Sequence, residues 1–385
     1  MGGGPTLSSV SRSTATIDLA AIRHNAAVLQ AAAPGAELCA VVKANGYGHG
    51  EVAAAHAAIT AGATVVAVAR VVEGARLRNA GIEVPIWVLS EPEAREWIDV
   101  ADYDLQATVY TQAGIDMAAA AAPTAPKGTG LSVHLKIDTG MHRVGAAPVD
   151  AVARAQEIVA APMLALASVW THLAMADVPG EAFNDEQLDR FEVVLASIED
   201  AGVDVPRTHA ANSGAVHAWP RAHRDVIRCG ISLYGLPPSP ELAGVLDLQP
   251  ALTWTSKVSL VKQLEAGDRV SYGQRTEVTE PTTAVTVPVG YADGYRRALW
   301  AGPPLVLIGG KKRRILGVVT MDQMVVDCGD DLIEVGDEVV LIGTQGNETV
   351  TADDLAAALD TINYEITCAI TDRVARKYIN RRVRS

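Results

Sequence analysis

AVVKANGYGHG, residues 40–50, places a lysine directly after an apolar run and before three closely spaced glycines. The apolar residues 38–42 predict a short buried strand, and the glycines predict a turn in which the backbone approaches a ligand closely. Lys43 therefore ends a strand, where a desolvated amine loses its proton and forms a Schiff base with a carbonyl group. A surface lysine that merely ends a strand is the alternative, and Lys43 by itself does not decide between them.

Composition limits the class of protein. The chain has 385 residues, which favours two or three domains, and 49% hydrophobic with only 4% aromatic residues indicates an aliphatic core. A net charge of −13 argues against a nucleic-acid partner. The four cysteines lack paired metal-ligand spacing, so we expect reduced thiols and no metal site. The first dozen residues lack an apolar leader core, and no apolar stretch reaches membrane-spanning length, so we expect a cytoplasmic protein without a membrane partner.

Short apolar strands alternate with alanine-rich segments of helical length over the first two thirds of the chain. The expected strands cover residues 38–42, 64–69, 85–89, 106–109, 131–137, 166–170, 208–210 and 226–228. Eight such units predict an α/β protein with a (β/α)8 barrel. A doubly wound sheet is the second choice, but no glycine fingerprint opens a dinucleotide site.

The sequence pattern changes near residue 248, where expected short strands are separated by Gly-Asp turns. This even spacing predicts a mostly β domain. We therefore expect a barrel domain over residues 13–246 and a mostly β domain over residues 247–385, with the N-terminal strand at residues 14–17 as a candidate addition to the second domain.

Polar residues follow four of the later barrel strands, at residues 136–143, 170–172, 209–214 and 228–231. Each group alone has a structural explanation, such as a helix cap or a buried salt bridge. The C-terminal strand ends of a barrel meet on one face, however, so together these groups predict an active site. Residues 212–214 and 230–231 combine a hydroxyl with glycines at expected helix starts, which is chemistry suited to phosphate.

The 40–50 segment, with later segments in the same order, resembles the bacterial alanine racemases over essentially the whole chain after the first dozen residues. The resemblance implies pyridoxal 5'-phosphate (PLP) as cofactor and a two-base racemase that interconverts L-alanine and D-alanine for peptidoglycan. It makes Lys43 the lysine that binds PLP. The other cofactor-binding residues that it implies are Tyr47, His172, Asn212, Ser213, Arg228, Gly230, Ile231 and Tyr364.

Racemisation removes the α-proton on one face and returns a proton on the other, and the resemblance assigns these tasks to Lys43 and Tyr272. A free tyrosine has a pKa near 10, so ionising Tyr272 at neutral pH requires roughly 4 kcal/mol from its surroundings. The resemblance also places an arginine, Arg228, against the ring nitrogen, where many PLP enzymes use an acid. A guanidinium keeps its proton, which weakens electron withdrawal and limits side reactions.

The remaining implied residues concern the substrate. Arg143 and Met321 are expected to bind its carboxylate, and Lys136 is expected to carry a carbamate that orients Arg143. The entry corridor that the resemblance implies is lined by Tyr291, Arg297 and Ile362. Val318 departs from the family, which often has an arginine there, and this puts fine substrate selectivity in doubt.

In the family, Tyr272 and Met321 complete the site of a second subunit, so the resemblance implies a homodimer with composite active sites. Three other functions remain as alternatives. A non-catalytic PLP carrier needs no second domain, and a PLP decarboxylase favours an acidic partner where this chain has Arg228. A broad-specificity or serine racemase is the alternative that these residues do not exclude.

Overall fold

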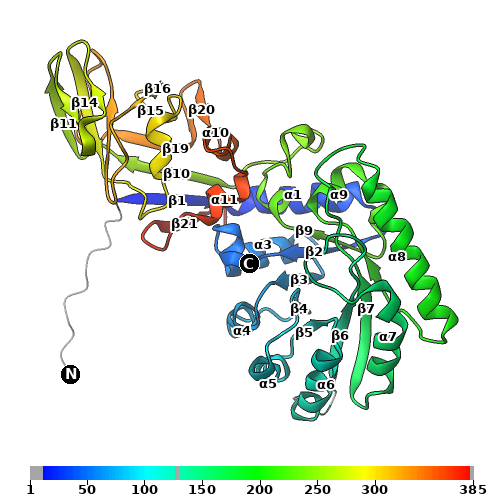
Figure 1. Ribbon diagram of the computed structural model, residues 1–385. Coiled ribbons are helices and arrows are strands. Elements are labelled where there is room, and N and C mark those ends of the chain that lie inside the picture. The colour runs from blue at the N-terminus through cyan, green and yellow to red at the C-terminus, as the bar shows by residue number, and fades with distance from the viewer. Residues whose placement is uncertain (1–11, 126–127, 129, 382–385) are drawn as a thin grey trace, which may run out of the picture. The chain divides into compact units, whose positions relative to one another are not determined.

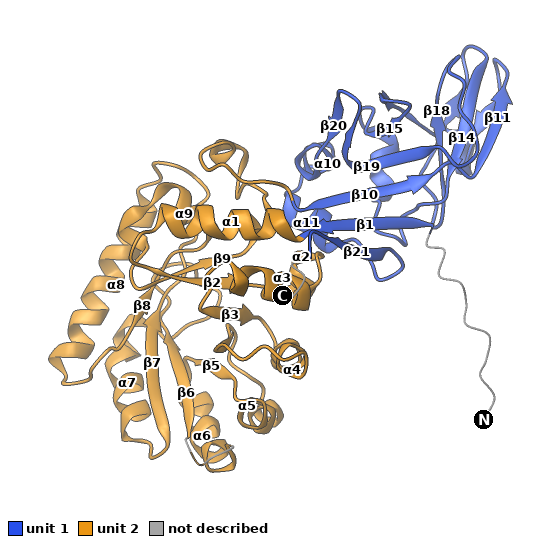
Figure 2. Ribbon diagram, turned by 180° about the vertical axis from the view of Figure 1, so that it is seen from behind, with its two compact units in different colours: residues 1–18, 251–385 blue, residues 19–250 orange. Residues whose placement is uncertain are grey.

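A computed structural model describes residues 12–125, 128 and 130–381. The N-terminal segment that lacks an apolar leader core therefore lies almost wholly outside the described residues. The chain forms two compact units, coloured separately in Figure 2. Unit 2 comprises Leu19–Pro250, and unit 1 comprises the described residues before Leu19 together with those from Ala251 onward.

Unit 2 contains a barrel of parallel strands, paired within the described residues in the order β8-β7-β6-β5-β4-β3-β2-β9. The strands are β2 (Glu37–Val41), β3 (Val65–Val68), β4 (Ile86–Val88), β5 (Gln106–Val109), β6 (Leu131–Lys136), β7 (Leu164–Trp170), β8 (Thr208–His209) and β9 (Val226–Cys229). Backbone bonds from Asp225 to Thr208 and from Arg228 to Ala211, each 3.1 Å, link the two end strands. The predicted (β/α)8 barrel is confirmed.

Helices of unit 2 lie outside the ring of strands (Figure 1). They are α1 (Leu19–Ala32), α3 (Glu51–Thr60), α4 (Val71–Asn79), α5 (Trp97–Asp102), α6 (Gln112–Ala121), α7 (Ala151–Ala160), α8 (Phe183–Asp200) and α9 (Ser213–Ala218). The short segment α2 (Lys43–Tyr47) is a left-handed turn after β2. In α1 the buried residues Leu19, Ile22, Ala26 and Leu29 recur at helical spacing and form its inner face. All four residues of β3 are buried, as expected of barrel strands packed on both faces.

Unit 1 is built mainly from β-sheets. Its larger sheet has the strand order β16-β15-β19-β10-β1-β21, with β20 beside β19, and a second sheet has the order β11-β14-β18-β17. The strands are β1 (Ser13–Asp18), β10 (Leu252–Lys257), β11 (Leu260–Leu264), β12 (Arg269–Val270), β13 (Thr276–Glu277), β14 (Thr282–Val287), β15 (Val306–Ile308), β16 (Lys311–Arg313), β17 (Ile315–Leu316), β18 (Met324–Asp327), β19 (Glu338–Gln345), β20 (Glu348–Val350) and β21 (Ala375–Ile379). The prediction of a mostly β second domain is confirmed.

The first described strand has its partners far along the sequence, beyond the barrel. β1 pairs antiparallel with β10 and parallel with β21, so it is an inner strand of the larger sheet. Two short helices, α10 (Ala352–Ala358) and α11 (Asn363–Cys368), complete unit 1. Of the helices described in either unit, none is long and apolar enough to span a membrane.

Candidate active site

Lys43 opens a left-handed turn directly after β2. Ala44, Asn45, Gly46 and Tyr47 have φ angles of 53°, 54°, 61° and 51°. Left-handed backbone costs a residue other than glycine about 1–2 kcal/mol, so three of these four residues are strained. The turn returns the chain quickly after the lysine, and it brings the Lys43 amine to 6.0 Å from the centre of the Tyr47 ring. The lysine is thus held on a tight and strained support.

A buried carboxylate on the helix that follows β3 stabilises this turn. Glu73, on α4, is 7% exposed. Its Oε1 accepts the Ala44 N–H at 2.8 Å, and its Oε2 accepts the N–H groups of Ala69 and Arg70 at 2.9 and 3.0 Å. Hydrogen bonds to an ionised acceptor are stronger than neutral ones. Glu73 therefore ties the segment after Lys43 to the end of β3.

Basic side chains gather at the C-terminal ends of the barrel strands. Lys136, the last residue of β6, is 4% exposed, with its amine 4.6 Å from the centre of the Trp170 ring. Burial, followed by the charges of Arg228 and Arg143, lowers the pKa of Lys136 to about 7, although Asp138 opposes the shift. The neutral amine is consequently far more accessible to Lys136 than to an ordinary lysine.

Arg228, on β9, is buried against neutral acceptors. Its Nη1 donates to His209 Nδ1 at 2.7 Å, and its Nη2 lies 3.2 Å from His172 Nδ1 and donates to the Thr171 carbonyl at 2.9 Å. Burial lowers the pKa of Arg228 to about 10, so the guanidinium remains charged at neutral pH. Burial and then the Arg228 charge hold the pKa of His172 well below its usual value. His172 is therefore neutral beside a cation.

Tyr47, Ser213 and Gly230 meet at a close backbone approach. A Cβ built on Gly230 would lie 2.3 Å from the Tyr47 hydroxyl oxygen, so a side chain there would displace the phenol. The Gly230 N–H donates to Ser213 Oγ at 2.9 Å. Asn212 caps α9 by accepting the Ala215 N–H at 3.1 Å, and Ile231 follows Gly230 at the start of a short 3-10 helix. The structure thus brings together the predicted phosphate-binding residues of unit 2.

In unit 1, Tyr272 lies on the surface with 76% of its area exposed. Together with Ser271, Thr320 and Met324 it lines a cavity of about 690 Å³. Ser271 Oγ donates to the Val318 carbonyl. The residue Val318 is only 2% exposed, so its side chain is buried. Tyr272 therefore belongs to an open cavity rather than to the packed core of its unit.

The other predicted residues of unit 1 are also accessible. Met321 is 52% exposed, Ile362 is 57% exposed and Tyr291 is 41% exposed. The Tyr291 N–H donates to the Thr320 carbonyl at 3.0 Å, which places the corridor residue Tyr291 beside the Met321 segment. Tyr364 is on α11, directly after Ile362 and Asn363. Arg297 opens the 3-10 helix Arg297–Ala301 and is exposed.

Sequence reasoning overlooked several buried polar residues near Arg228. His209 was noted only as part of a polar strand end, while His134 and Ser168 received no role. A detectable signal existed for Ser168, which is a buried polar residue in an otherwise apolar strand, β7. His134 was less conspicuous, because β6 also contains Ser132 and Lys136. Glu73 gave no such signal, because a glutamate in the first turn of a helix is an ordinary capping residue.

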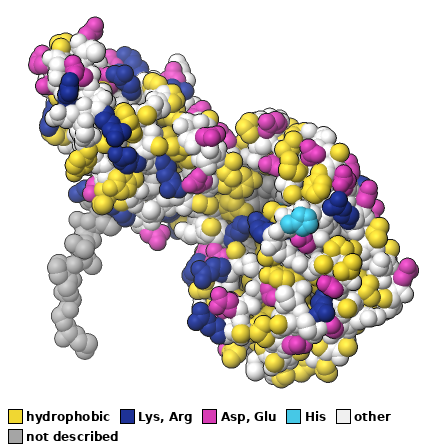
Figure 3. Space-filling view, viewed as in Figure 1, with side chains coloured by type: hydrophobic (Ala, Val, Ile, Leu, Met, Phe, Trp, Pro, Cys, Tyr) yellow, Lys and Arg dark blue, Asp and Glu magenta, His cyan; other side chains and the backbone are white. Residues whose placement is uncertain are grey.

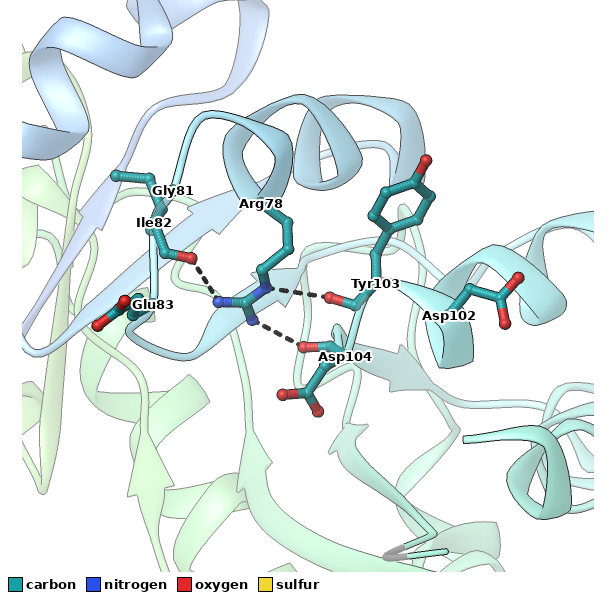
Figure 4. Close-up of a pocket in the computed structure, with 7 residues that line it drawn as sticks. All are labelled: Arg78, Gly81, Ile82, Glu83, Asp102, Tyr103 and Asp104. Carbon is teal, nitrogen blue, oxygen red and sulfur yellow. Dashed lines mark hydrogen bonds between the residues drawn. The ribbon is translucent and has the colours of Figure 1, made fainter. Parts of the chain in front are cut away.

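Besides the cavity in unit 1, unit 2 has a cavity whose lining residues have a structural role (Figure 4). It measures about 440 Å³ and is lined by Arg78 with residues 81–83 and 102–104, which precede β4 and β5. Arg78 donates to the carbonyls of Tyr103, Ile82 and Asp104 at 3.0, 2.6 and 2.8 Å. These are the N-terminal strand ends, where a barrel places stabilising rather than catalytic residues.

Charged and polar side chains at the C-terminal strand ends, led by a lysine in a strained turn, define unit 2 as the barrel of a (β/α)8 enzyme. Two family models match the chain. "Alanine racemase, N-terminal domain" covers residues 17–238 and "Alanine racemase, C-terminal domain" covers residues 251–378. The chain belongs to the alanine racemase family, and it is an isomerase that acts on amino acids.

Relatives agree with this assignment over nearly the whole chain. The alanine racemase of Symbiobacterium thermophilum is 45% identical over 94% of this chain and 96% of its own, and that of Frankia casuarinae is 42% identical over 96% of each. Among solved structures, alanine racemase from Streptomyces lavendulae has a TM-score of 0.91 at 41% identity and covers 98% of both chains. Alanine racemase from Bacillus anthracis, with bound L-Ala-P, has a TM-score of 0.89 at 35% identity over 98% of this chain and 96% of its own.

Proposed function

We propose that the chain is a PLP-dependent, two-base racemase that interconverts L-alanine and D-alanine and so supplies peptidoglycan synthesis. The basic cluster of unit 2 carries this proposal. Lys43, Arg143 and Arg228 all lower the pKa of Lys136, and Asp138 is the acidic group that raises it. Lys43, Arg143 and Arg228 surround Lys136 with a single carboxylate among them, so the basic groups repel one another unless further anions join them. The phosphate of PLP and the carboxylate of alanine are suitable anions.

The residues of unit 2 fit a phosphate. The Tyr47 hydroxyl, the Ser213 hydroxyl and the Gly230 N–H converge where an added Cβ finds no room. Hydroxyl and backbone N–H groups are the donors that proteins use for phosphates. The residues of this chain that would hold PLP are Lys43, Tyr47, His172, Asn212, Ser213, Arg228, Gly230, Ile231 and, from unit 1, Tyr364.

When bound, PLP supplies a conjugated ring that draws electrons from the α-carbon of an attached amino acid. The chain's own residues handle the protons. Lys43 Nζ would exchange a proton with the α-carbon on one face, and Tyr272 Oη would do so on the other. Arg228 would meet the ring nitrogen as a donor, because its pKa of about 10 keeps it charged at neutral pH.

Arg143 and the backbone at Met321 would bind the substrate carboxylate. Carbamylation of Lys136 replaces a positive charge with a negative one, which would orient Arg143 and relieve the repulsion among the cations. Tyr291, Arg297 and Ile362 would narrow the entry for small substrates. A broad-specificity or serine racemase is the second candidate, because serine differs from alanine by a single small hydroxyl.

We further propose a homodimer in which each unit 1 completes the partner's site. Tyr272 and Met321 support this proposal, since they are 76% and 52% exposed within their own unit. An isologous contact between two copies creates two such sites at once. Acidic and basic side chains are interspersed over the visible face in Figure 3, which supports a protein without a nucleic-acid partner. A cytoplasmic location would give the enzyme access to its small-molecule substrate.

Loss of optical rotation tests the reaction. Pure L-amino acids are incubated with the enzyme, with and without added PLP. We expect turnover of L-alanine that increases with PLP. Comparable turnover of L-serine would favour the second candidate, and carbon dioxide release would replace racemisation with decarboxylation.

Subunit mixing tests the composite site. A Lys43→Ala chain and a Tyr272→Phe chain are each expected to be nearly inactive. Their mixture should recover activity, because one of the two sites in a heterodimer then contains both native residues. Absence of recovery after demonstrated subunit exchange would show that each site is built within one chain.

A further inference from the structure

One hydrogen-bonded chain of side chains runs through the barrel and ends at Arg228. Its members come from consecutive strands, β4 to β9, and its links are Trp87 Nε1 to Gln106 Oε1 (2.9 Å), Gln106 Oε1 to His134 Nε2 (3.2 Å), His134 Nδ1 to Ser168 Oγ (2.7 Å), Ser168 Oγ to His209 Nε2 (2.9 Å) and His209 Nδ1 to Arg228 Nη1 (2.7 Å). Ser168 and His209 are fully buried. Buried polar groups at such sites are costly unless each has a partner.

The two ends determine where every proton lies. A guanidinium only donates, so His209 Nδ1 accepts and His209 Nε2 carries the hydrogen. At the other end the Trp87 indole only donates, and the Gln106 Oε1 that it meets only accepts, so His134 Nε2 also carries a hydrogen. Ser168 then accepts from His209 and donates to His134 Nδ1. All members are satisfied when both imidazoles are neutral.

The surroundings of His209 keep its ring neutral. The ring stacks between Trp87 and Trp170, with centroid distances of 4.9 and 5.3 Å. Burial is the main reason that its pKa lies well below the usual value, and Arg228, His134 and Arg207 all act in the same direction. A second proton, on Nδ1, would face the Arg228 N–H, donor against donor. Geometry and electrostatics therefore exclude the imidazolium.

Arg228 in turn relies on this neutral acceptor. Among the described residues, its hydrogen-bond partners are two imidazoles and the carbonyls of Thr171 and Ala210. Its guanidinium carbon lies 4.8 Å from the centre of the Trp170 ring. None of these described partners is a carboxylate, so no neighbouring negative charge balances the positive charge of Arg228. Its charge then reaches the active site, where it acts on both Lys136 and His172.

We propose that this hydrogen-bonded series of side chains fixes His209 as the Nε2–H tautomer. Nδ1 then always offers Arg228 an acceptor and sets the orientation of the guanidinium. His209 is a positioning residue in this arrangement, and Ser168 and His134 hold its tautomer. The chain is not a proton relay, because a relay needs an end that takes up a proton. Neither Arg228 nor the Gln106 carbonyl does so.

Nitrogen NMR of the holoenzyme labelled with ¹⁵N-histidine measures the tautomer directly. The His209 signals are identified by their absence from a His209→Asn variant. We expect an unprotonated Nδ1 and a protonated Nε2 from about pH 6 to about pH 9. A protonated Nδ1, or titration of His209 in this range, would overturn the proposal. The tautomer is read from the native sequence, and the variant serves only to identify the signals.

Two replacements of His209 distinguish its role in positioning Arg228 from a role in packing alone. Asn places its carbonyl oxygen near the position of Nδ1 and preserves the acceptor for Arg228, whereas Gln reaches the position of Nε2 and preserves only the Ser168 side. We expect His209→Gln to lower kcat for alanine by about tenfold to a hundredfold, with little change in KM, and His209→Asn to retain at least about tenfold more kcat than His209→Gln. Equal losses, or the reverse order, would contradict the positioning role.

A third variant tests the part of the hydrogen-bonded series that does not contact Arg228. Ser168→Ala removes the acceptor of His209 Nε2–H without touching Arg228, so we expect the His209 nitrogen signals to shift and kcat to fall. Thr108→Val is the matched control, since Thr108 carries a buried hydroxyl on β5 that takes no part in the hydrogen-bonded series. Unchanged His209 signals in Ser168→Ala would refute the support that we assign to Ser168.

Discussion

Lys136 combines burial with an unusual charge environment. It is 4% exposed, it faces the Trp170 ring, and the charges of Arg228 and Arg143 reach it. Burial and these cations disfavour the ammonium form, which is why the pKa falls to about 7 instead of 10.5. A neutral lysine amine is the form that adds carbon dioxide, and the product carries a negative charge that the same cations stabilise.

We predict that carbamylation of Lys136 increases as the pH rises through about 7. The sign follows from the lowered pKa, because the reactive neutral amine predominates above that value and the ammonium predominates below it. Carbon NMR of the holoenzyme in ¹³C-bicarbonate should show a carbamate signal that is absent from Lys136→Arg. A spectrum without this signal at about pH 8.5, or a signal that grows as the pH falls, would contradict the prediction.

At the scale of single elements, the turn after β2 depends on Glu73 more than on its own residues. Ala44 and Asn45 adopt left-handed backbone at a cost, and the hydrogen bond from Ala44 to Glu73 spans 29 positions of sequence. The strain beside Lys43 is therefore maintained by a tertiary contact. This arrangement fixes the direction in which the lysine leaves its strand.

Glu73→Gln is predicted to lower the free energy of unfolding by about 1–3 kcal/mol, because an amide presents one acceptor where the carboxylate presents two. Urea unfolding of the holoenzyme measures this change. Glu96→Gln is the control, because Glu96 accepts the Glu93 N–H at a more exposed helix start. A loss for Glu73→Gln no larger than that of Glu96→Gln would show that the turn stands without the carboxylate.

The Arg78 guanidinium joins two loops at the opposite end of the barrel (Figure 4). Because its planar fork donates to several carbonyls at once, lysine is a poor substitute. We predict that Arg78→Lys lowers the free energy of unfolding by about 1–3 kcal/mol and leaves kcat for alanine unchanged. A variant with native stability, or one with reduced kcat, would contradict this structural role.

Elements with continuous apolar character were predictable from sequence. Residues 64–69 were expected as a strand, and Val65–Val68 form β3, because barrel strands buried on both faces have continuous apolar sequences. The left-handed turn was not predictable, since Ala44 has no local preference for that backbone. The buried chain to Arg228 was also missed, because its polar residues are 19 to 41 positions apart and meet only when neighbouring strands align.

For the whole molecule, the proposed dimer makes activity depend on concentration. If Tyr272 of one copy serves the other, specific activity should fall on dilution in step with dissociation, while the far-UV circular dichroism signal stays constant. Mass photometry at the same concentrations measures the dimer fraction. Full activity of a fully dissociated enzyme would contradict the composite site, and loss of circular dichroism would point to unfolding.

The place of β1 in its sheet has a consequence for synthesis on the ribosome. β1 emerges before the barrel, but its neighbours β10 and β21 are translated only after the whole barrel sequence. Domains fold as they are made, beginning from the N-terminus, so the barrel completes its hydrogen bonding while β1 waits unpaired. A nascent chain halted before Ala375 would therefore carry a finished barrel and an open β-sheet edge, which is the state that chaperones must shield.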